Sequence, residues 1–258
     1  MNYQEIIAKD NNKLKQLTKL ATDRTYRYEQ GLAVIYGEHL VQEAQKHGIL
    51  NSVFVSTNAV SAQQQLLTQC DPKQIFVLDG LLLNKCKLSD SPIDIAATIL
   101  IRYTNLDNRI YAEDCIILDN IQDPGNLGTI MRAACASGVK NLILGIGCVD
   151  PYNIKVLRAS QGLQFNLNIS SGIDIAAFIN KCKIPVLATA INANKSIYTC
   201  NLENPVAWVF GNEGSGLSTK ILSTCDKVSI PMSGDAESLN VAMAATICLF
   251  ETMRQRSI

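Results

Sequence analysis

Long apolar runs are missing from this 258-residue chain. A membrane-spanning helix needs about 18 consecutive apolar residues, and no run approaches that length. Residues 1–20 are polar and basic, so they do not have the apolar core of a secretory signal peptide. We therefore expect a protein that does not enter a membrane and that works in the cytoplasm.

Histidine is scarce, and closely paired cysteines are absent. The chain has 2 histidines and 9 cysteines, and no two cysteines form a C-x-x-C pair. Zinc sites are built from closely spaced cysteine and histidine ligands, so we expect no metal site. Cysteines such as Cys115, Cys135 and Cys248 lie in apolar runs. We interpret them as reduced, buried thiols of a cytosolic protein.

An excess of positive charge is also absent, because 23 basic residues balance 23 acidic ones. This balance argues against nucleic-acid binding by the surface as a whole, but it is compatible with a local basic patch. One candidate patch is a helix expected over residues 11–30. Its cations are Lys13, Lys15, Lys19, Arg24 and Arg27. They could form a solvated face, or a face that contacts phosphates.

The length of the chain suggests one large or two modest domains. Short apolar runs first alternate with helical stretches, a pattern typical of an α/β sandwich. The expected strands are 32–36, 53–56, 75–78 and 95–101, and the expected helices are 37–47, 60–70 and 81–88. The polar stretch 102–113 is typical of a linker. We therefore predict one domain over residues 1–104 and a second over residues 113–258.

The second domain repeats the alternation. The expected strands are 115–118, 142–144, 165–169, 186–190, 206–210 and 228–230, and the expected helices are 127–137, 153–159, 173–181 and 238–254. Short apolar runs buried on both faces favour a mostly parallel sheet. A dinucleotide-binding Rossmann fold has weak support, because Gly145-Ile146-Gly147 lacks the third glycine of that motif. Asp235 and Ser238 are both suitable caps for the last helix.

Three motifs in this domain follow one another in a specific order. They are DNIQDPGNLGTIMRAACASG (119–138), WVFGNEGSGLS (208–218) and IPM-x-G-x-x-x-SLNV (230–241). Together they resemble the SpoU (TrmH) family of RNA 2'-O-methyltransferases, which belong to the trefoil-knotted SPOUT class. The resemblance implies an α/β fold in which a knotted methyltransferase domain with a mostly parallel sheet follows a small L30e-like α/β domain that binds the RNA substrate. Residues 21–44 resemble that small domain, although 91–97 depart from its usual Thr-Pro-Gln-Gly pattern.

The resemblance implies S-adenosylmethionine as the methyl donor. Glycines after the strand 206–210 let the backbone approach a ligand closely, although alone they could form an ordinary turn. Backbone around Gly211, Ile230 and Leu239 would hold the adenosine, with Ile230 and Met232 beside the adenine. The cofactor-binding residues implied are Gly211, Asn212, Gly216, Ile230, Met232, Ser238 and Leu239.

Four residues are implied for catalysis, namely Asn126, Arg132, Glu213 and Asn240. Composition alone would make Arg132 a surface or ion-paired arginine. In the family pattern Asn-x-Gly-x-x-x-Arg, this arginine is proposed to activate the ribose 2'-hydroxyl. A guanidinium with a pKa above about 12 is a poor base, so Arg132 could instead bind the adjacent phosphate and stabilise oxyanion charge. Ala242 departs from the family, which usually has a hydroxyl residue there.

RNA contacts are predicted at Arg24, Arg27 and Arg158. Arg24 and Arg27 belong to the basic helix described above. Arg158 opens the segment 158–162, which resembles the family's R-A-S-x-G. It could equally complement the dipole of a helix that Gly162 ends.

The expected function is S-adenosylmethionine-dependent methylation of a ribose 2'-hydroxyl in structured RNA. Ribosomal RNA is favoured because the L30e-like domain accompanies ribosomal RNA enzymes in this family. The alternatives are a tRNA 2'-O-methyltransferase and a non-catalytic RNA-binding or ribosome-assembly protein on the same fold. The resemblance also implies a homodimer through two helices of the second domain. Each of the apolar positions offered for this contact could be ordinary core, and about half of this surface must be. The positions are Ala242, Ala245, Leu249, Met253, Ile130, Ala133, Ala134 and Ser137.

Overall fold

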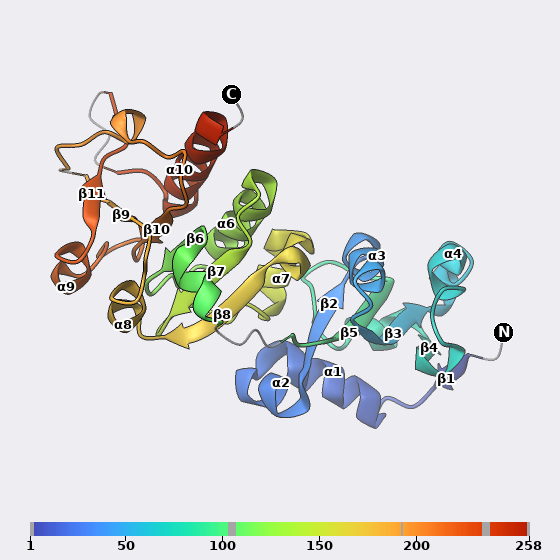
Figure 1. Cartoon of the computed structure of the whole chain (residues 1–258). Helices are drawn as coiled ribbons and strands as arrows, with labels where there is room; N and C mark the ends of the chain where they lie inside the picture. Colours follow the sequence, from blue (N-terminus) through green and yellow to red (C-terminus); the bar gives the residue numbers. More distant parts are fainter. Residues whose placement is uncertain (1–2, 103–106, 192, 234–237, 257–258) are drawn as a thin grey trace. The chain divides into compact units, whose positions relative to one another are not determined.

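The chain forms two compact units in a computed structural model that describes residues 3–102, 107–191, 193–233 and 238–256 (Figure 1). Unit 1 joins Met1–Arg102 with Tyr152–Phe165, and unit 2 joins Tyr103–Pro151 with Asn166–Ile258. The sequence prediction assigns all of 113–258 to one domain, whereas the contacts of Tyr152–Phe165 group this segment with unit 1. Residues 103–106 of the predicted linker lie outside the described residues.

Unit 1 is built on a mixed five-stranded sheet with the strand order β1-β4-β3-β5-β2. Its strands are β1 (Gln4–Ile6), β2 (Leu32–Tyr36), β3 (Leu50–Ser56), β4 (Ile75–Leu78) and β5 (Ile95–Leu100). Strand β5 runs antiparallel to both β2 and β3, and the remaining pairs are parallel. Its helices are α1 (Asn12–Thr22), α2 (Arg24–Gln30), α3 (Glu38–Lys46), α4 (Gln64–Leu67), α5 (Gly80–Asn84) and α7 (Ile154–Ser160).

Two apolar cores cover the two faces of this sheet. Successive side chains of a strand point to opposite faces, so Val34 of β2 joins one core while its neighbours Ala33 and Ile35 join the other. The Val34 core contains side chains of α1 and α5. The Ile35 core contains side chains of α3, α4 and α7, including the buried Leu157. Unit 1 is therefore a three-layer α/β/α sandwich.

Asp23 divides the single helix predicted over 11–30 into α1 and α2. It ends α1 in an extended conformation, and its carboxylate accepts a hydrogen bond from the backbone N of Tyr26 at 3.0 Å. This is the usual role of an N-cap residue. Other helix predictions were too long as well, since 60–70 yields only α4 and 81–88 ends at Asn84.

Unit 2 contains a six-stranded sheet with the order β11-β9-β10-β6-β7-β8, and every pairing in it is parallel. Its strands are β6 (Cys115–Leu118), β7 (Asn141–Gly145), β8 (Asn168–Ile173), β9 (Val186–Thr189), β10 (Ala207–Phe210) and β11 (Asp226–Val228). The chain adds β7 and β8 on one side of β6, then β9, β10 and β11 on the other. The winding direction therefore reverses between β6 and β10, and ligands of open parallel sheets bind at the carboxyl ends of strands at such a point.

Helices α6 (Pro124–Ser137), α8 (Ile175–Ile179), α9 (Thr219–Leu222) and α10 (Val241–Arg256) complete unit 2. Helices α6 and α10 pack against each other (Figure 1). Helix α10 also packs on β10, where the indole Nε1 of Trp208 donates to Thr252 Oγ1 at 3.0 Å. The predicted strand 165–169 is wrong in position, because Phe165 lies in the core of unit 1 and β8 begins at Asn168.

Helix α10 begins at Val241, three residues later than predicted. Asn240 provides the cap, because its Oδ1 accepts hydrogen bonds from the backbone N of Ala242 at 2.9 Å and of Met243 at 3.3 Å. Ser238 precedes the helix, and the other predicted cap, Asp235, lies outside the described residues.

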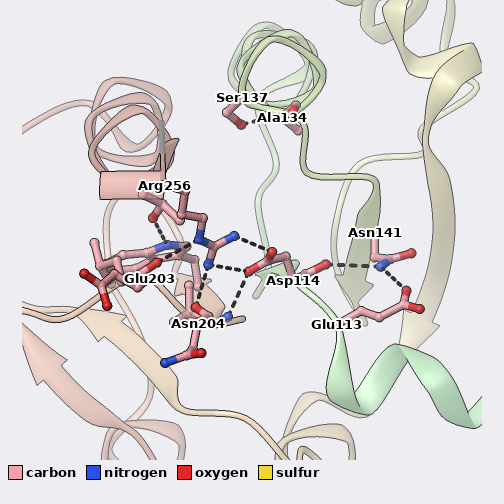
Figure 2. A network of polar contacts seen from close by, with 12 residues as sticks. Glu113, Asp114, Ala134, Ser137, Asn141, Glu203, Asn204 and Arg256 are labelled. Carbon is pink, nitrogen blue, oxygen red and sulfur yellow. Dashed lines mark hydrogen bonds and ion pairs between the residues drawn. The ribbon is translucent and has the colours of Figure 1, made fainter. Parts of the chain in front are cut away.

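A polar network anchors the end of α10 beside the start of β6 (Figure 2). Arg256 donates to both carboxylate oxygens of Asp114, at 2.5 and 3.0 Å, and to the carbonyl oxygens of Leu202 and Asn204. Asp114 Oδ1 also accepts from the backbone N of Val206 at 2.8 Å. These contacts join the last helix to the amino ends of two central strands.

Candidate active site

The three sequence motifs meet at the carboxyl edge of the unit 2 sheet. The first motif leaves β6 and enters α6, whose first turn contains Asn126. The second leaves β10 as the loop 211–217, and the third follows β11 and ends at the start of α10. Because β6 and β10 are neighbours at the winding reversal, these segments lie where a parallel sheet binds ligands.

Side chains from all three motifs form one hydrogen-bonded chain. Asn240 Nδ2 donates to Asn126 Oδ1 at 2.9 Å, across 114 positions of the sequence. Asn126 Nδ2 in turn donates to Glu213 Oε1 at 3.0 Å, across 87 positions. Three of the four residues predicted for catalysis are therefore linked, with Asn126 bonded to both of the others. Asn126 uses its amide as donor on one side and acceptor on the other, which holds the amide in one orientation.

Asn212 fastens the loop after β10 to the loop after β6. Its Nδ2 donates to the backbone oxygen of Asn120 at 2.9 Å. Its Oδ1 accepts from the backbone N of Gly214 at 3.0 Å and of Ser215 at 3.1 Å. Asn212 thus shapes the loop that carries Glu213, rather than simply lining a cofactor pocket.

Gly211 is required by the loop itself. A Cβ atom at this position would lie 2.5 Å from the backbone carbon of Gly216 and 2.5 Å from the backbone N of Leu217. The backbone N of Gly216 donates back to the carbonyl oxygen of Asn212 at 2.9 Å, which closes the turn. The sequence prediction attributed this glycine to the approach of a ligand, whereas the space beside it is occupied by the chain's own backbone.

Asn120 is a site residue that the motif analysis did not single out. Its φ of 55° is unusual for a residue with a side chain. Gly147 makes room for it, since a Cβ there would lie 2.4 Å from Asn120 Oδ1. This contact explains a glycine that had looked like part of a weak dinucleotide motif. Asn120 lies two residues after the buried strand β6, and this position is the sequence feature that could have pointed to it.

Partly open apolar side chains surround the ends of the neighbouring strands. Ile230, Met232 and Leu239, all predicted to bind the cofactor, are each half-buried. Ile191 follows β9 and is 63% exposed, and it lies outside the three sequence motifs. Apolar surface of this kind at a strand edge suits a flat aromatic base. Burial also raises the pKa of the Asp119 carboxyl, which follows β6 directly.

Arg132 stands apart from the hydrogen-bonded chain. Both Asn126 and Arg132 lie within α6, six residues apart. Six residues at about 3.6 per turn carry the two side chains to different sides of the helix. Arg132 is exposed, and within the described ranges it makes no hydrogen bond or ion pair.

The three arginines predicted to contact RNA differ in accessibility. Arg27 is only 3% exposed and donates to the carbonyl oxygen of Leu20 at 2.7 Å, so it satisfies the end of α1 and is not available to a phosphate. Arg24 is exposed beside the ring of Tyr28, and Arg158 is exposed over the ring of Tyr36. Both remain accessible.

Several dimer contacts predicted on α6 and α10 are wrong, because the chain buries them itself. Ala242, Ala245 and Leu249 of α10 are buried, as are Ile130, Ala133 and Ala134 of α6.

Within the described ranges, no helix is long and apolar enough to cross a membrane. No group of three or more possible metal ligands is found there either. All nine cysteines are free thiols, each buried or half-buried.

An all-parallel α/β unit with a polar site at its winding reversal defines a ligand-binding domain of the kind that many enzymes use. Comparison with known families is more specific. Residues 114–250 match the SpoU rRNA Methylase family, and the chain belongs to that family.

Relatives resemble the chain over nearly its whole length. An uncharacterized tRNA/rRNA methyltransferase of Synechocystis is 31% identical, with 97% of this chain and 94% of that protein covered. The 23S rRNA (guanosine(2553)-2'-O)-methyltransferase RlmP of Bacillus subtilis is also 31% identical, with 95% and 98% covered. The SpoU methyltransferase AviRb of Streptomyces viridochromogenes, solved with the cofactor AdoMet, superposes with a TM-score of 0.85 at 27% identity, covering 96% and 99%.

Proposed function

We propose that this protein transfers a methyl group from S-adenosylmethionine to a ribose 2'-hydroxyl of ribosomal RNA in the cytoplasm. The observation that carries the proposal is the chain Asn240–Asn126–Glu213, which joins the three motifs at the carboxyl edge of the sheet. The 23S rRNA methyltransferases among the relatives support ribosomal RNA as the substrate.

The residues at this edge fit the methyl donor. Half-buried Ile230, Met232 and Leu239 offer apolar surface to an adenine, and the loop after β10 offers exposed backbone. S-adenosylmethionine supplies an electrophilic methyl group on its sulfonium. The protein then has to hold the ribose hydroxyl in line with that methyl, and such alignment can supply much of the rate. The hydroxyl proton leaves to water as the bond from oxygen to the methyl carbon forms and the carbon–sulfur bond breaks.

We propose that Arg132 stabilises charge rather than acting as a base. A guanidinium keeps its proton at neutral pH, since its pKa exceeds about 12. Its five N–H donors suit a phosphate or a developing oxyanion. The exposure of Arg132 allows it to meet an RNA that approaches α6. Asn126, Glu213 and Asn240 position one another beside the substrate.

We also propose a homodimer that uses the outer face of α10. Met243 and Phe250 are 62% and 39% exposed, and they share one side of the helix with the half-buried Ile247 and Met253. Large exposed apolar side chains in one stripe mark a contact surface. We further propose that unit 1 is an L30e-like domain and that unit 2 contains a trefoil knot. The resemblance of the three motifs to the family supports both assignments.

An in vitro transfer assay tests the proposed function. The purified chain is incubated with tritiated S-adenosylmethionine and a 23S rRNA transcript, and the RNA is digested with alkali. A 2'-O-methyl group prevents alkaline cleavage at its nucleotide, so we expect the label in dinucleotides that resist alkali. Label in mononucleotides would indicate methylation of bases, and absence of label would contradict methyl transfer to this RNA.

A further inference from the structure

A groove in unit 1 collects lysines from separate parts of the chain. Its volume is about 430 Å³, and it lies between α1 and the segment 82–86. Its cationic residues are Lys9, Lys15, Lys19 and Lys85. Thr18 and Thr22 add hydroxyl groups, while Leu14, Leu82 and Cys86 form the apolar part of the lining.

Helical spacing explains why α1 faces the groove with polar residues. Lys15 and Lys19 are four residues apart, as are Thr18 and Thr22, and each lysine precedes a threonine by three residues, so all four lie on one side of the helix. The apolar Leu17 and Leu20 are buried away from the groove, while Leu14 is buried beside it and lines it. Helix α1 has no acidic residue, so its cations are not balanced within the helix.

The pairings of these lysines leave positive charge available. Lys15 Nζ lies 3.4 Å from Asp10 Oδ1, but both side chains are exposed, and such pairs are weak. Lys19 Nζ lies 4.2 Å from the ring centre of Tyr26, which orients the ammonium group without neutralising it. Like charges collected in one groove repel one another, and a bound anion relieves that repulsion.

We propose that this groove binds the phosphodiester backbone of the RNA substrate. Lysine ammonium groups bind phosphates as point charges and read no sequence, which is what a surface that holds RNA for a separate site requires. The inference rests on the proposed function for the identity of the ligand, and it assigns unit 1 a specific RNA-holding surface. Of the five cations considered in the sequence, only Lys15 and Lys19 line the groove, and Lys9 and Lys85 are new.

Two double variants of the full-length chain test the groove. Lys15→Gln with Lys85→Gln removes two charges from the groove. Lys46→Gln with Lys73→Gln removes two from exposed lysines of unit 1 that do not line it. Filter binding of a labelled 23S rRNA transcript is measured from 50 to 200 mM salt. The groove variant should bind about tenfold more weakly at the low salt end, and its slope of log affinity against log salt should fall by about 1.4, or ~0.7 for each lost phosphate contact.

Methyl transfer separates the two proposals. The groove variant should raise KM for RNA, keep kcat at saturating RNA, and bind S-adenosylmethionine as the wild type does by calorimetry. Equal RNA affinities and salt slopes for the two variants would overturn the groove even if the wild type methylates RNA. Conversely, loss of RNA affinity only in the groove variant would support the groove even if the wild type transferred no methyl group, and only the proposed function would then fall.

Discussion

At the scale of single residues, Gly211 and Gly214 occupy the same loop but face different surroundings. A Cβ on Gly211 would overlap the backbone of Gly216 and Leu217, whereas a Cβ on Gly214 would lie 3.6 Å from Asn212 Oδ1, an ordinary contact. The first glycine is therefore needed for the path of the loop, and the second is not.

We predict that Gly211→Ala abolishes binding of S-adenosylmethionine and that Gly214→Ala preserves it. The physical reason is that the loop must open to admit the new Cβ, which displaces Glu213 from Asn126. Calorimetric titration of both variants provides the measurement, with circular dichroism to verify that each is folded. Normal affinity in the Gly211 variant would separate this loop from the donor site.

Arg132 supports a second prediction at this scale. Arg132→Ala should leave donor binding nearly unchanged and slow methyl transfer at least ~10²-fold, the usual effect of losing one preorganised charge-stabilising group. Arg132→Lys keeps the charge but loses the planar donor pair, so it should recover only part of the rate. A wild-type rate in the alanine variant would show that Arg132 is a surface residue.

Residue roles were predictable only in part. The motifs identified Asn126, Glu213 and Asn240, but nothing in their spacing showed that they touch one another. The sequence did not show that the space beside Gly211 is filled by the backbone of Gly216 and Leu217, and the role of Gly211 toward the cofactor stays a prediction. Arg27 was misassigned because the break at Asp23 turns it toward the end of α1, where its charge is buried.

At the scale of elements, α10 contains a carboxylate that couples its last turns to pH. Glu251 is 8% exposed, and Arg254 and Gln255 both donate to it. Several interactions lower the pKa of Glu251 from 4.5 to about 2, and the hydrogen bond from Arg254 has the largest effect. A carboxyl with a lowered pKa stabilises the fold above its unfolded pKa, and the effect is lost as the pH falls through the folded pKa.

We therefore predict that Glu251→Gln lowers the free energy of unfolding at pH 7 and that this deficit shrinks as the pH falls from about 5 to about 2. Below that range the wild-type carboxyl is protonated in both states. Urea unfolding at several pH values measures the effect. Glu203→Gln, at an exposed carboxyl, is the control, and a deficit equal at all pH values would argue against the ion pair.

Strands were predicted better than helices. The strands 32–36, 75–78 and 115–118 were located correctly because each is a short apolar run bounded by polar or turn residues. Helix ends depend on individual caps, and Asp23 and Asn240 decided where two of them fall. The segment near Phe165 has a strand-like sequence, but it contributes to the core of unit 1, which is a long-range effect.

At the scale of the whole molecule, the alternation of strands and helices predicted two α/β units, and the parallel sheet of unit 2 is confirmed. The grouping of Tyr152–Phe165 with unit 1 was not foreseeable, because local pattern carries no information about which core a helix joins. Six of the eight positions predicted for a dimer contact are buried in the chain itself, where α6 and α10 pack against each other.

We predict that the protein is a dimer in solution, with twice the chain mass of 28.2 kDa. Phe250→Glu should convert it to a monomer, because a charge in an apolar contact would be buried without a partner. Ile7→Glu, at an exposed apolar residue of unit 1, should leave the dimer intact. Light scattering at micromolar concentration decides, and a wild-type monomer that still methylates RNA would contradict the dimer.

Ribose methylation in the cell is the most direct measure of the central claim. Ribosomal RNA from cells with and without the gene is digested, and 2'-O-methylated nucleotides are mapped by mass spectrometry. We expect one ribose methylation of ribosomal RNA to disappear without the gene and to return with the wild-type gene but not with the Arg132→Ala variant. Identical maps for all strains, or a lost methyl group confined to tRNA, would contradict ribosomal RNA 2'-O-methylation by this protein.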